Sequence, residues 1–249
     1  KFDVKVVGVT GSVGKTTTKD MIALVVAQKY KTLKTQGNHN NEIGMPQTLF
    51  GLDSSYEAAV IEMGMSHQGE ISRMSMSCQP DVAVITNIGI SHIENLGTQE
   101  NILKAKLEIL DGAAYDAPLI LCRDDKLLAG VQLHSDRKVY YYSVSKKDCD
   151  VYASGVKTIN YEGGKIAAQI NCLGEHNVKN ALAAFCVGLA LDIPPEDIVK
   201  GIAQFKPEGL RQNVTVIDGV TYIVDCYNAA PDSMKASLSV LSQAQAEGK

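Results

Sequence analysis

The sequence predicts an α/β protein in which helices flank a mostly parallel β-sheet. Short continuous apolar runs, such as residues 58–63 (AAVIEM) and 81–87 (DVAVITN), are typical of parallel strands that are buried on both faces. These runs alternate along the chain with longer stretches of helical periodicity, which is the pattern of a sheet built from βαβ units. The composition agrees with a globular protein, since 45% of the 249 residues are hydrophobic and 21% are charged.

The individual elements follow from these runs in chain order. Buried strands are expected at residues 4–9, 31–35, 58–63, 81–87 and 118–122. Helices are expected around the apolar run 21–27, from about Pro46, and at residues 69–77, 98–110, 177–191 and 195–205. Pro46 suits the first turn of a helix, where a missing N–H group has no partner, and Thr98 is a suitable N-cap.

Two later segments depart from this alternation. Residues 139–171 form short alternating runs with a Gly-Gly turn at 163–164, so we expect a small antiparallel appendix there. A linker-like break at 206–209 (KPEG) follows the expected helix at residues 195–205. Beyond the break we expect two short strands and a helix, at residues 214–217, at residues 221–225 and from Pro231 onward. We therefore expect a central domain at residues 1–207 and an incomplete C-terminal α/β domain at residues 208–249.

Charge and cysteine content exclude several classes of protein. The 24 basic and 28 acidic residues give a net charge of −4, which creates no field for nucleic acid or an anionic membrane. The six cysteines include no C-x-x-C pair and lie mostly in apolar surroundings, which predicts reduced core thiols of a cytosolic protein and no zinc site. No apolar run approaches the ~20 residues of a transmembrane helix, and no signal peptide opens the chain. Because the chain starts on a strand at Lys1 without a methionine, we expect an excised domain.

A glycine-rich segment, TGSVGKTTTKD, links the first expected strand to the first expected helix. Gly11 and Gly14 can adopt positive φ, which lets backbone N–H groups converge on an anion at the positive end of the helix dipole. Lys15 would reach the β- and γ-phosphates of a nucleotide, and the Thr16 hydroxyl would bind Mg²⁺. The strict pattern has a glycine where this chain has Val9, and an ordinary helix start is the alternative. The context favours a P-loop NTPase-like phosphate loop, formed by Thr10, Gly11, Ser12, Val13, Gly14, Lys15, Thr16 and Thr17.

Polar side chains also stand at the carboxyl ends of two expected buried strands. Glu62 ends one of them and Asn87 ends the next. Ligands of open α/β sheets bind beyond the carboxyl ends of the strands, so we expect both residues to face the phosphate loop. A carboxylate is a hard oxygen ligand suited to Mg²⁺. Glu62 is therefore a candidate metal ligand, and a hydrogen-bonded carboxylate at a strand end is the alternative.

Further motifs run through nearly the whole chain: GVTGSVGKTTTKDM, GNHNNEIGMP, VIEMGMSHQGEI, VITNIGISHIENLG, KAKLEIL, LGEHNVKNALAA, and GLRQ with VDCYNAAPDSM. In this order they resemble the Mur ligases. The segments GNHNNEIGMP and YNAAPDSM resemble most the members that add D-alanyl-D-alanine to UDP-N-acetylmuramoyl-tripeptide in bacterial peptidoglycan synthesis. The resemblance implies an ATP-dependent amide ligase of the bacterial cytoplasm, active as a monomer with two Mg²⁺ ions. In such an enzyme a substrate carboxylate attacks the γ-phosphate of ATP to form an acyl phosphate, and the dipeptide amine then displaces phosphate.

The resemblance implies roles for several residues whose function the sequence alone does not indicate. It makes His92 a ligand of the second Mg²⁺, whereas a lone loop histidine is more often a surface residue. It places a carbamylated lysine at Lys106; by periodicity alone, both Lys104 and Lys106 would be solvated residues of a helix. The candidate catalytic and metal-binding groups are thus Lys15, Thr16, Glu62, His92 and Lys106.

The nucleotide contacts implied by the resemblance come from the second half of the chain. Asn177 and Asn180, with His176 nearby, are candidates for the adenine pocket, while helix capping is the alternative. Arg211 would reach the phosphates and Asp225 the ribose; the motif around Arg211 is GLRQ, where relatives often have GR or MRM. The polar loop is expected at the γ-phosphate or acceptor side and is otherwise a simple turn; its candidate residues are Asn38, Asn40 and Asn41.

Two alternative functions remain open from the sequence. A folylpolyglutamate synthase-like ligase shares the same loop, acid and lysine, although the asparagine-rich GNHNNEIGMP segment argues against it. The chain as given is alternatively a nucleotide-binding module that binds ATP without ligating, because it lacks the domains that would hold the other two substrates. A regulatory GTPase is disfavoured, since no N-K-x-D-like segment is present.

Overall fold

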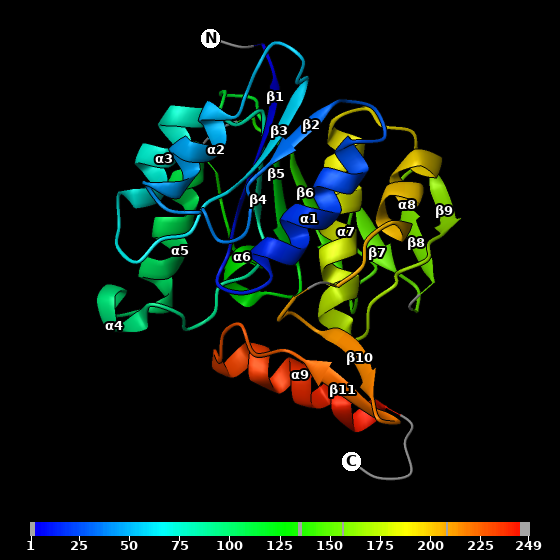
Figure 1. Ribbon diagram of the computed structural model, residues 1–249. Helices are drawn as coiled ribbons and strands as arrows, with labels where there is room; N and C mark the ends of the chain where they lie inside the picture. Colours follow the sequence, from blue (N-terminus) through cyan, green and yellow to red (C-terminus); the bar gives the residue numbers. More distant parts are fainter. Residues whose placement is uncertain (1–2, 134–135, 156, 208, 245–249) are drawn as a thin grey trace.

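A nine-stranded sheet forms the centre of the protein in the computed structural model, which describes residues 3–133, 136–155, 157–207 and 209–244 (Figure 1). The strand order is β2-β3-β1-β4-β5-β6-β7-β8-β9. The strands are β1 (Lys5–Thr10), β2 (Thr32–Lys34), β3 (Ala58–Glu62), β4 (Val82–Ile85), β5 (Leu119–Cys122), β6 (Val139–Ser143), β7 (Val151–Ala153), β8 (Thr158–Tyr161) and β9 (Gly164–Ala167). The pairs from β2 through β7 are parallel, which confirms the predicted mostly parallel sheet.

Helices cover both faces of this sheet, with α1, α7 and α8 on one face and α3 and α5 on the other (Figure 1). Their bounds are α1 (Lys15–Val26), α2 (Gly44–Phe50), α3 (Glu70–Cys78), α4 (Ile93–Leu96), α5 (Gln99–Leu107), α6 (Lys126–Ala129), α7 (Glu175–Ala190), α8 (Pro195–Ala203) and α9 (Pro231–Gln243), with a 3₁₀ turn at Glu108–Leu110. The four-residue helices α4 and α6 were not predicted, because one helical turn is too short to show a period.

Burial explains why the apolar runs become the sheet. All five residues of β3 and all four residues of β4 are buried, so these strands have no solvated face. Helices α1 and α8 pack closely because Gly201 has no side chain; a Cβ there would lie 2.6 Å from the Cα of Val25. The Thr98 side chain accepts a hydrogen bond from the Asn101 N–H, which confirms the predicted N-cap of α5.

The expected antiparallel appendix is smaller than predicted. Strands β6 and β7 pair in parallel with the main sheet, and antiparallel pairing is confined to β7-β8 and β8-β9. The prediction was wrong about β6 and about the pairing of β6 with β7, because alternating apolar residues indicate a strand but not its direction, which long-range pairing decides. The turn between β8 and β9 at residues 162–163 agrees with the predicted Gly-Gly position.

The C-terminal segment forms a separate two-stranded sheet, β10 (Asn213–Ile217) and β11 (Val220–Val224), followed by α9. The three predicted elements are confirmed. Figure 1 places this segment beside the carboxyl ends of the central strands. Glu208, at the proposed boundary between the two parts, and Lys1 lie outside the described residues. The division at residue 207 stays a prediction.

The cysteines and the helix lengths bear on two further expectations. All six cysteines are free thiols; Cys78, Cys122 and Cys186 are buried as predicted, while Cys226 is exposed. Burial raises the pKa of Cys78 to about 12 and that of Cys122 to about 11. In the part of the chain that the structure describes, no helix combines the length and the apolar character needed to span a bilayer.

Candidate functional site

The predicted phosphate loop connects β1 to α1 and has the required backbone geometry. Gly11 has φ 150° and Gly14 has φ 80°. A Cβ on Gly11 would lie 1.9 Å from the Thr86 Oγ1, so only glycine fits against β4 at this point. Gly14 is the N-cap of α1 and supplies no capping side chain. The N–H groups of the first turn of α1 therefore lack intrahelical partners and point toward any anion bound at this end of the helix.

Lys15 folds back over this loop. Its Nζ donates hydrogen bonds to the Gly11 carbonyl at 2.9 Å and the Ser12 carbonyl at 3.4 Å. Burial lowers the pKa of Lys15, and the positive charge of Arg211 lowers it further, while Glu62 opposes the shift. The side chain is thus held where a phosphate at the start of α1 would meet it.

The structure gives three residues of the predicted loop other partners. The Thr10 hydroxyl donates to the Met63 carbonyl at 2.8 Å, which ties β1 to β3. The Ser12 N–H donates to the Asn87 carbonyl at 3.1 Å, and the Val13 N–H donates to the Asn87 Oδ1 at 3.0 Å. The backbone amides of Ser12 and Val13 are therefore already hydrogen-bonded within the protein.

Glu62 stands at the end of β3 and is 1% exposed. Its Oε1 accepts hydrogen bonds from the Asn40 Nδ2 at 2.7 Å and from the Thr16 hydroxyl at 3.3 Å. Its Oε2 is buried and has no hydrogen-bond partner among the described residues. The structure therefore does not show the hydrogen-bonded carboxylate that was the alternative from the sequence, because one of its two oxygens lacks a partner in the part of the chain that is described. A buried oxygen without a hydrogen bond costs free energy. An orphaned carboxylate oxygen beside a hydroxyl fits a hard divalent cation.

A cleft of about 430 Å³ lies on the Lys15 side of the loop. Asn40, Glu70, His92 and Lys106 contribute to its lining. His92 adopts the left-handed conformation with φ 66°, an uncommon backbone state for histidine that is often found at functional sites. Burial, followed by the charges of Lys106 and Lys15, lowers the pKa of His92, which favours the neutral imidazole that binds metals.

Lys106 is buried in this cleft, with 2% of its side chain exposed, whereas Lys104 is exposed. The periodicity-based expectation of a solvated residue is right for Lys104 and wrong for Lys106, because the cleft at the α5 end cannot be seen in the local sequence. Burial holds the pKa of Lys106 well below its usual range, and the nearby charge of Lys15 adds to this.

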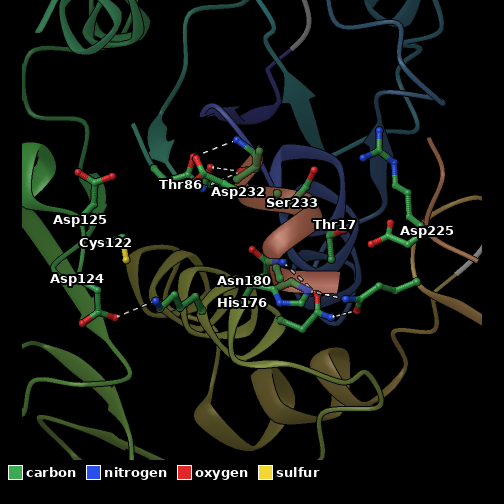
Figure 2. Close-up of a pocket in the computed structure, with 18 of the residues that line it drawn as sticks. Thr17, Thr86, Cys122, Asp124, Asp125, His176, Asn180, Asp225, Asp232 and Ser233 are labelled. Carbon is green, nitrogen blue, oxygen red and sulfur yellow. Dashed lines mark hydrogen bonds and ion pairs between the residues drawn. The ribbon is translucent and has the colours of Figure 1, made fainter. Parts of the chain in front are cut away.

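A second cavity of about 370 Å³ lies on the other side of the loop, between the start of α7 and the C-terminal segment (Figure 2). His176, Asn177, Asn180, Arg211 and Asp225 all line it. In Figure 2, His176 and Asn180 lie near its centre, with Asp225 toward one side. The residues predicted to contact a nucleotide base, ribose and phosphates therefore share one cavity, although Arg211 and Asp225 are far from the others in sequence.

Asn177 does not cap α7, because the helix starts at Glu175 with Gly174 as its N-cap. Instead the Asn177 Nδ2 donates to the Leu173 carbonyl and to the Gln212 Oε1, both at 2.7 Å. Asn180 donates to the Asn177 Oδ1 at 3.2 Å. These bonds fix both amides and join the start of α7 to the C-terminal segment.

Arg211 precedes β10 and Asp225 follows β11, so both lie at the open end of this antiparallel hairpin. The Arg211 guanidinium lies 3.8 Å from the centre of the Tyr227 ring. Burial lowers the pKa of His176, while its hydrogen bond with Gln212 and the charge of Asp225 oppose the shift. Burial thus favours a neutral His176, whose ring contacts the Gln212 side chain.

Sequence reasoning missed several residues of these cavities. Gln212 bridges His176 and Asn177, and Asp232 at the start of α9 contributes to the wall near Thr86 (Figure 2). Gln212 immediately follows the predicted Arg211, but nothing in the letters shows that it reaches α7. Asp232 gives no local signal beyond a common acidic residue in the first turn of a helix.

Most of the chain, including the loop, matches a known family. Residues 9–188 match the sequence profile of the Mur ligase middle domain. The chain belongs to the Mur ligase family. That match includes the phosphate loop, the cleft residues and the two asparagines of α7, and it ends before Arg211.

Relatives within the Mur ligase family extend the similarity to nearly the whole chain. The chain is 41% identical to the "UDP-N-acetylmuramoyl-tripeptide--D-alanyl-D-alanine ligase" of Bacillus subtilis (strain 168), over 98% of the chain and 54% of that protein. It is 35% identical to MurF from Acinetobacter baumannii, with a TM-score of 0.92 over 98% of the chain and 55% of that structure. A MurF ligase from Thermotoga maritima, solved in complex with ADP, is 29% identical with a TM-score of 0.85, over 97% and 57% of the two chains. The chain spans about half the length of the curated relatives it matches.

Proposed function

We propose that this chain is the ATP-binding part of a Mur ligase that joins D-alanyl-D-alanine to UDP-N-acetylmuramoyl-tripeptide, with release of ADP and phosphate. The observation that carries the proposal is the buried Glu62 carboxylate at the start of α1. Its Oε1 accepts a hydrogen bond from the Thr16 hydroxyl, and its Oε2 has no partner among the described residues. A buried acid at a phosphate loop supplies the metal site that phosphoryl transfer needs. The names of the B. subtilis and A. baumannii relatives support the choice of substrates.

The triphosphate of ATP would lie across the N-terminus of α1, between the two cavities. The amides of Gly14 to Thr17 would bind its oxygens, and the Lys15 ammonium would neutralise charge on the β- and γ-phosphates. The cavity between the start of α7 and the C-terminal segment would take the nucleoside, with the base near Asn177 and Asn180. Arg211 would bind phosphate, and Asp225 would accept hydrogen bonds from the ribose. The ADP complex of the T. maritima relative supports binding of an adenine nucleotide by this chain.

Two Mg²⁺ ions would be held by Thr16 and Glu62 at the start of α1 and by His92 and Lys106, the latter as a carbamate, which line the cleft. When bound, the ions reduce the repulsion between the substrate carboxylate and the triphosphate. Asn40 fixes the orientation of the Glu62 carboxylate through its 2.7 Å hydrogen bond. The substrate carboxylate would attack the γ-phosphorus from the cleft side, and the dipeptide amine would then displace phosphate from the acyl phosphate.

The asparagine-rich loop would face the acceptor side of this cleft. Asn41 is also committed to structure, since its Oδ1 accepts the N–H groups of Ile43 and Gly44 at the start of α2. Asn38 is exposed. Among the three asparagines predicted for the substrate, Asn40 therefore has the clearest connection to the reacting groups, and Asn38 is free to turn toward the acceptor.

Calorimetric titration of Mg-ATP, with Mg-GTP as the comparison, tests the proposal on this chain directly. We expect ATP to bind and GTP to bind much more weakly, and we expect no ligation of the dipeptide by this chain alone. Binding of neither nucleotide would contradict the proposal. ADP release that depends on folate and glutamate would favour the folylpolyglutamate synthase-like alternative. Ligation of D-alanyl-D-alanine by the 249 residues alone would contradict the expectation that this chain only binds the nucleotide.

We also propose that Lys106 carries a carbamate. The neutral amine nitrogen would add to the carbon of CO₂ and release one proton, so that a neutral group beside Lys15 becomes an anion. The lowered pKa favours this reaction, because the fraction of neutral amine at neutral pH is larger than for an exposed lysine. Its burial beside Lys15 also disfavours the ammonium form.

Carbon-13 NMR in labelled bicarbonate is expected to show a carbamate signal in the unmodified protein that weakens as the pH is lowered. Lys106→Arg should abolish the signal, because a guanidinium does not add CO₂. The matched change Lys104→Arg, in an exposed lysine of the same helix, should leave it intact. A signal that persists in Lys106→Arg would contradict the assignment.

The setting of this activity follows from the same proposal. Peptidoglycan precursors of this class are made in the bacterial cytoplasm and serve cell-wall growth, cell shape and division. We propose that the chain works there as a monomer, in a protein whose central domain covers residues 1–207 and whose C-terminal domain begins at residue 208. Neither nucleic acid nor a membrane surface is a proposed partner, in keeping with the net charge of −4.

A further inference from the structure

The amide of Asn87 is bound to both backbone groups of one residue in the phosphate loop. The Val13 N–H donates to the Asn87 Oδ1 at 3.0 Å, and the Asn87 Nδ2 donates to the Val13 carbonyl at 3.0 Å. The Asn87 carbonyl also accepts the Ser12 N–H at 3.1 Å. A single residue beyond β4 thus makes three hydrogen bonds to two consecutive loop residues, as a neighbouring strand would.

The loop has no such support of its own. β1 ends at Thr10, and the segment that follows is bounded by Gly11 and Gly14, both with positive φ. Glycines make this turn sterically possible but leave the unbound backbone with many accessible conformations. The side-chain amide of Asn87, together with the Thr86 hydroxyl bound to the Val13 carbonyl at 2.8 Å, restricts that freedom.

Asn87 is in turn held in place by its neighbours. The Ile88 N–H donates to the Asp125 Oδ2 at 2.7 Å, and the Gly89 N–H donates to the Ser12 Oγ at 2.9 Å. The Oδ1 of Asp125 caps α6 by accepting the N–H groups of Leu127 and Leu128. The segment after β4 is therefore itself held by hydrogen bonds and can restrain the phosphate loop that contacts it.

We propose that Asn87 is a positioning residue that sets the shape of the phosphate loop by binding the backbone of Val13. The inference rests on the proposed nucleotide site and deepens it. Because Asn87 occupies the amides of Ser12 and Val13, it leaves the amides from Gly14 onward aligned on the phosphates without binding the phosphates itself.

Amide hydrogen exchange of the nucleotide-free protein tests the proposal without depending on ligand binding. Asn87→Ala is expected to speed exchange of the Val13 amide about 30-fold, since a lost hydrogen bond and a loosened turn together raise the population of the open state. The amides of β1 should keep their wild-type protection. Asn160→Ala, which removes another amide that binds backbone and a side chain near β7, is the control and should change nothing in the loop.

Titration of ADP and of adenosine supplies the functional readout. In Asn87→Ala the affinity for ADP should fall about 30-fold and that for adenosine much less, because the loop amides bind the phosphates while Asn87 forms only part of the cavity wall. Asn87→Asp, which keeps the size but removes the donor to the Val13 carbonyl, should weaken ADP in the same direction. If the wild-type protein bound neither ligand, the proposed function would fail, and the exchange experiment would still decide the role of Asn87. Unchanged Val13 exchange in Asn87→Ala, or loss of protection throughout β1 in both variants, would overturn the inference.

Discussion

Replacing Lys15 by alanine is expected to lower the affinity for Mg-ATP about 100-fold, because hydrogen bonds from a charged donor to phosphate contribute about 3 kcal/mol when they replace water. In the free protein the ammonium already lies over the loop, bound to the Gly11 and Ser12 carbonyls. Its position therefore needs little rearrangement when a triphosphate arrives. Calorimetric titration of both proteins with Mg-ATP measures the loss directly.

The variant should remain folded, because burial lowers the pKa of Lys15 and its charged form gains little from the fold. Thermal unfolding of the nucleotide-free protein checks this point. The control is Lys147→Ala, in an exposed lysine of the loop between β6 and β7, which should bind ATP like the wild type. Equal affinity of Lys15→Ala and wild type for ATP would place the triphosphate elsewhere.

Replacing Glu62 by glutamine is expected to remove most of the Mg²⁺ dependence of ATP binding. The unpartnered Oε2 is the ligand that a cation would gain in this structure, and glutamine presents one neutral oxygen in place of a carboxylate. We expect ATP to bind about 30-fold more weakly in Mg²⁺, whereas binding in EDTA should match the wild type. Titration with and without Mg²⁺ separates the metal effect from the nucleotide contacts.

Glu62→Gln should weaken Mg-ATP binding without lowering the stability of the ligand-free protein. A buried carboxylate oxygen without a partner costs free energy, so glutamine should leave the melting temperature of the ligand-free protein unchanged or higher. Glu57→Gln, at the opposite end of β3 and exposed, is the matched control and should keep the full Mg²⁺ effect. A Glu62→Gln protein that still binds Mg-ATP with wild-type affinity would sink the metal-site assignment.

The predicted fold was largely right because its signals are local. Continuous apolar runs mark strands buried on both faces, as in β3 and β4, and a single hydroxyl at Thr98 marks the start of α5. The direction of β6 and β7 could not be read in this way. Their alternating residues are compatible with either orientation, and pairing with β5 decides it.

The candidate site divides in the same manner. The glycines, Lys15 and Thr16 are consecutive in sequence, so one strand, loop and helix unit brings them together without reference to the rest of the chain. Glu62 was predicted from its place at a strand end, since parallel strands present their carboxyl ends at one edge. The burial of Lys106 could not be predicted from the sequence, because it depends on segments that pack beside the nine-residue helix α5 and are distant in the chain.

The sequence by itself determined the α/β class, the phosphate loop and the family motifs, because each depends on residues that are neighbours in the chain or on a period of two or 3.6 residues. The tertiary structure alone decided which polar groups have partners. It left the Glu62 Oε2 unpaired, bound the amide of Asn87 to Val13, and joined Gln212 to Asn177 across 35 residues. Hydrogen bonds of this kind act over about 3 Å, so they depend on where distant segments meet in space and leave no pattern in the sequence.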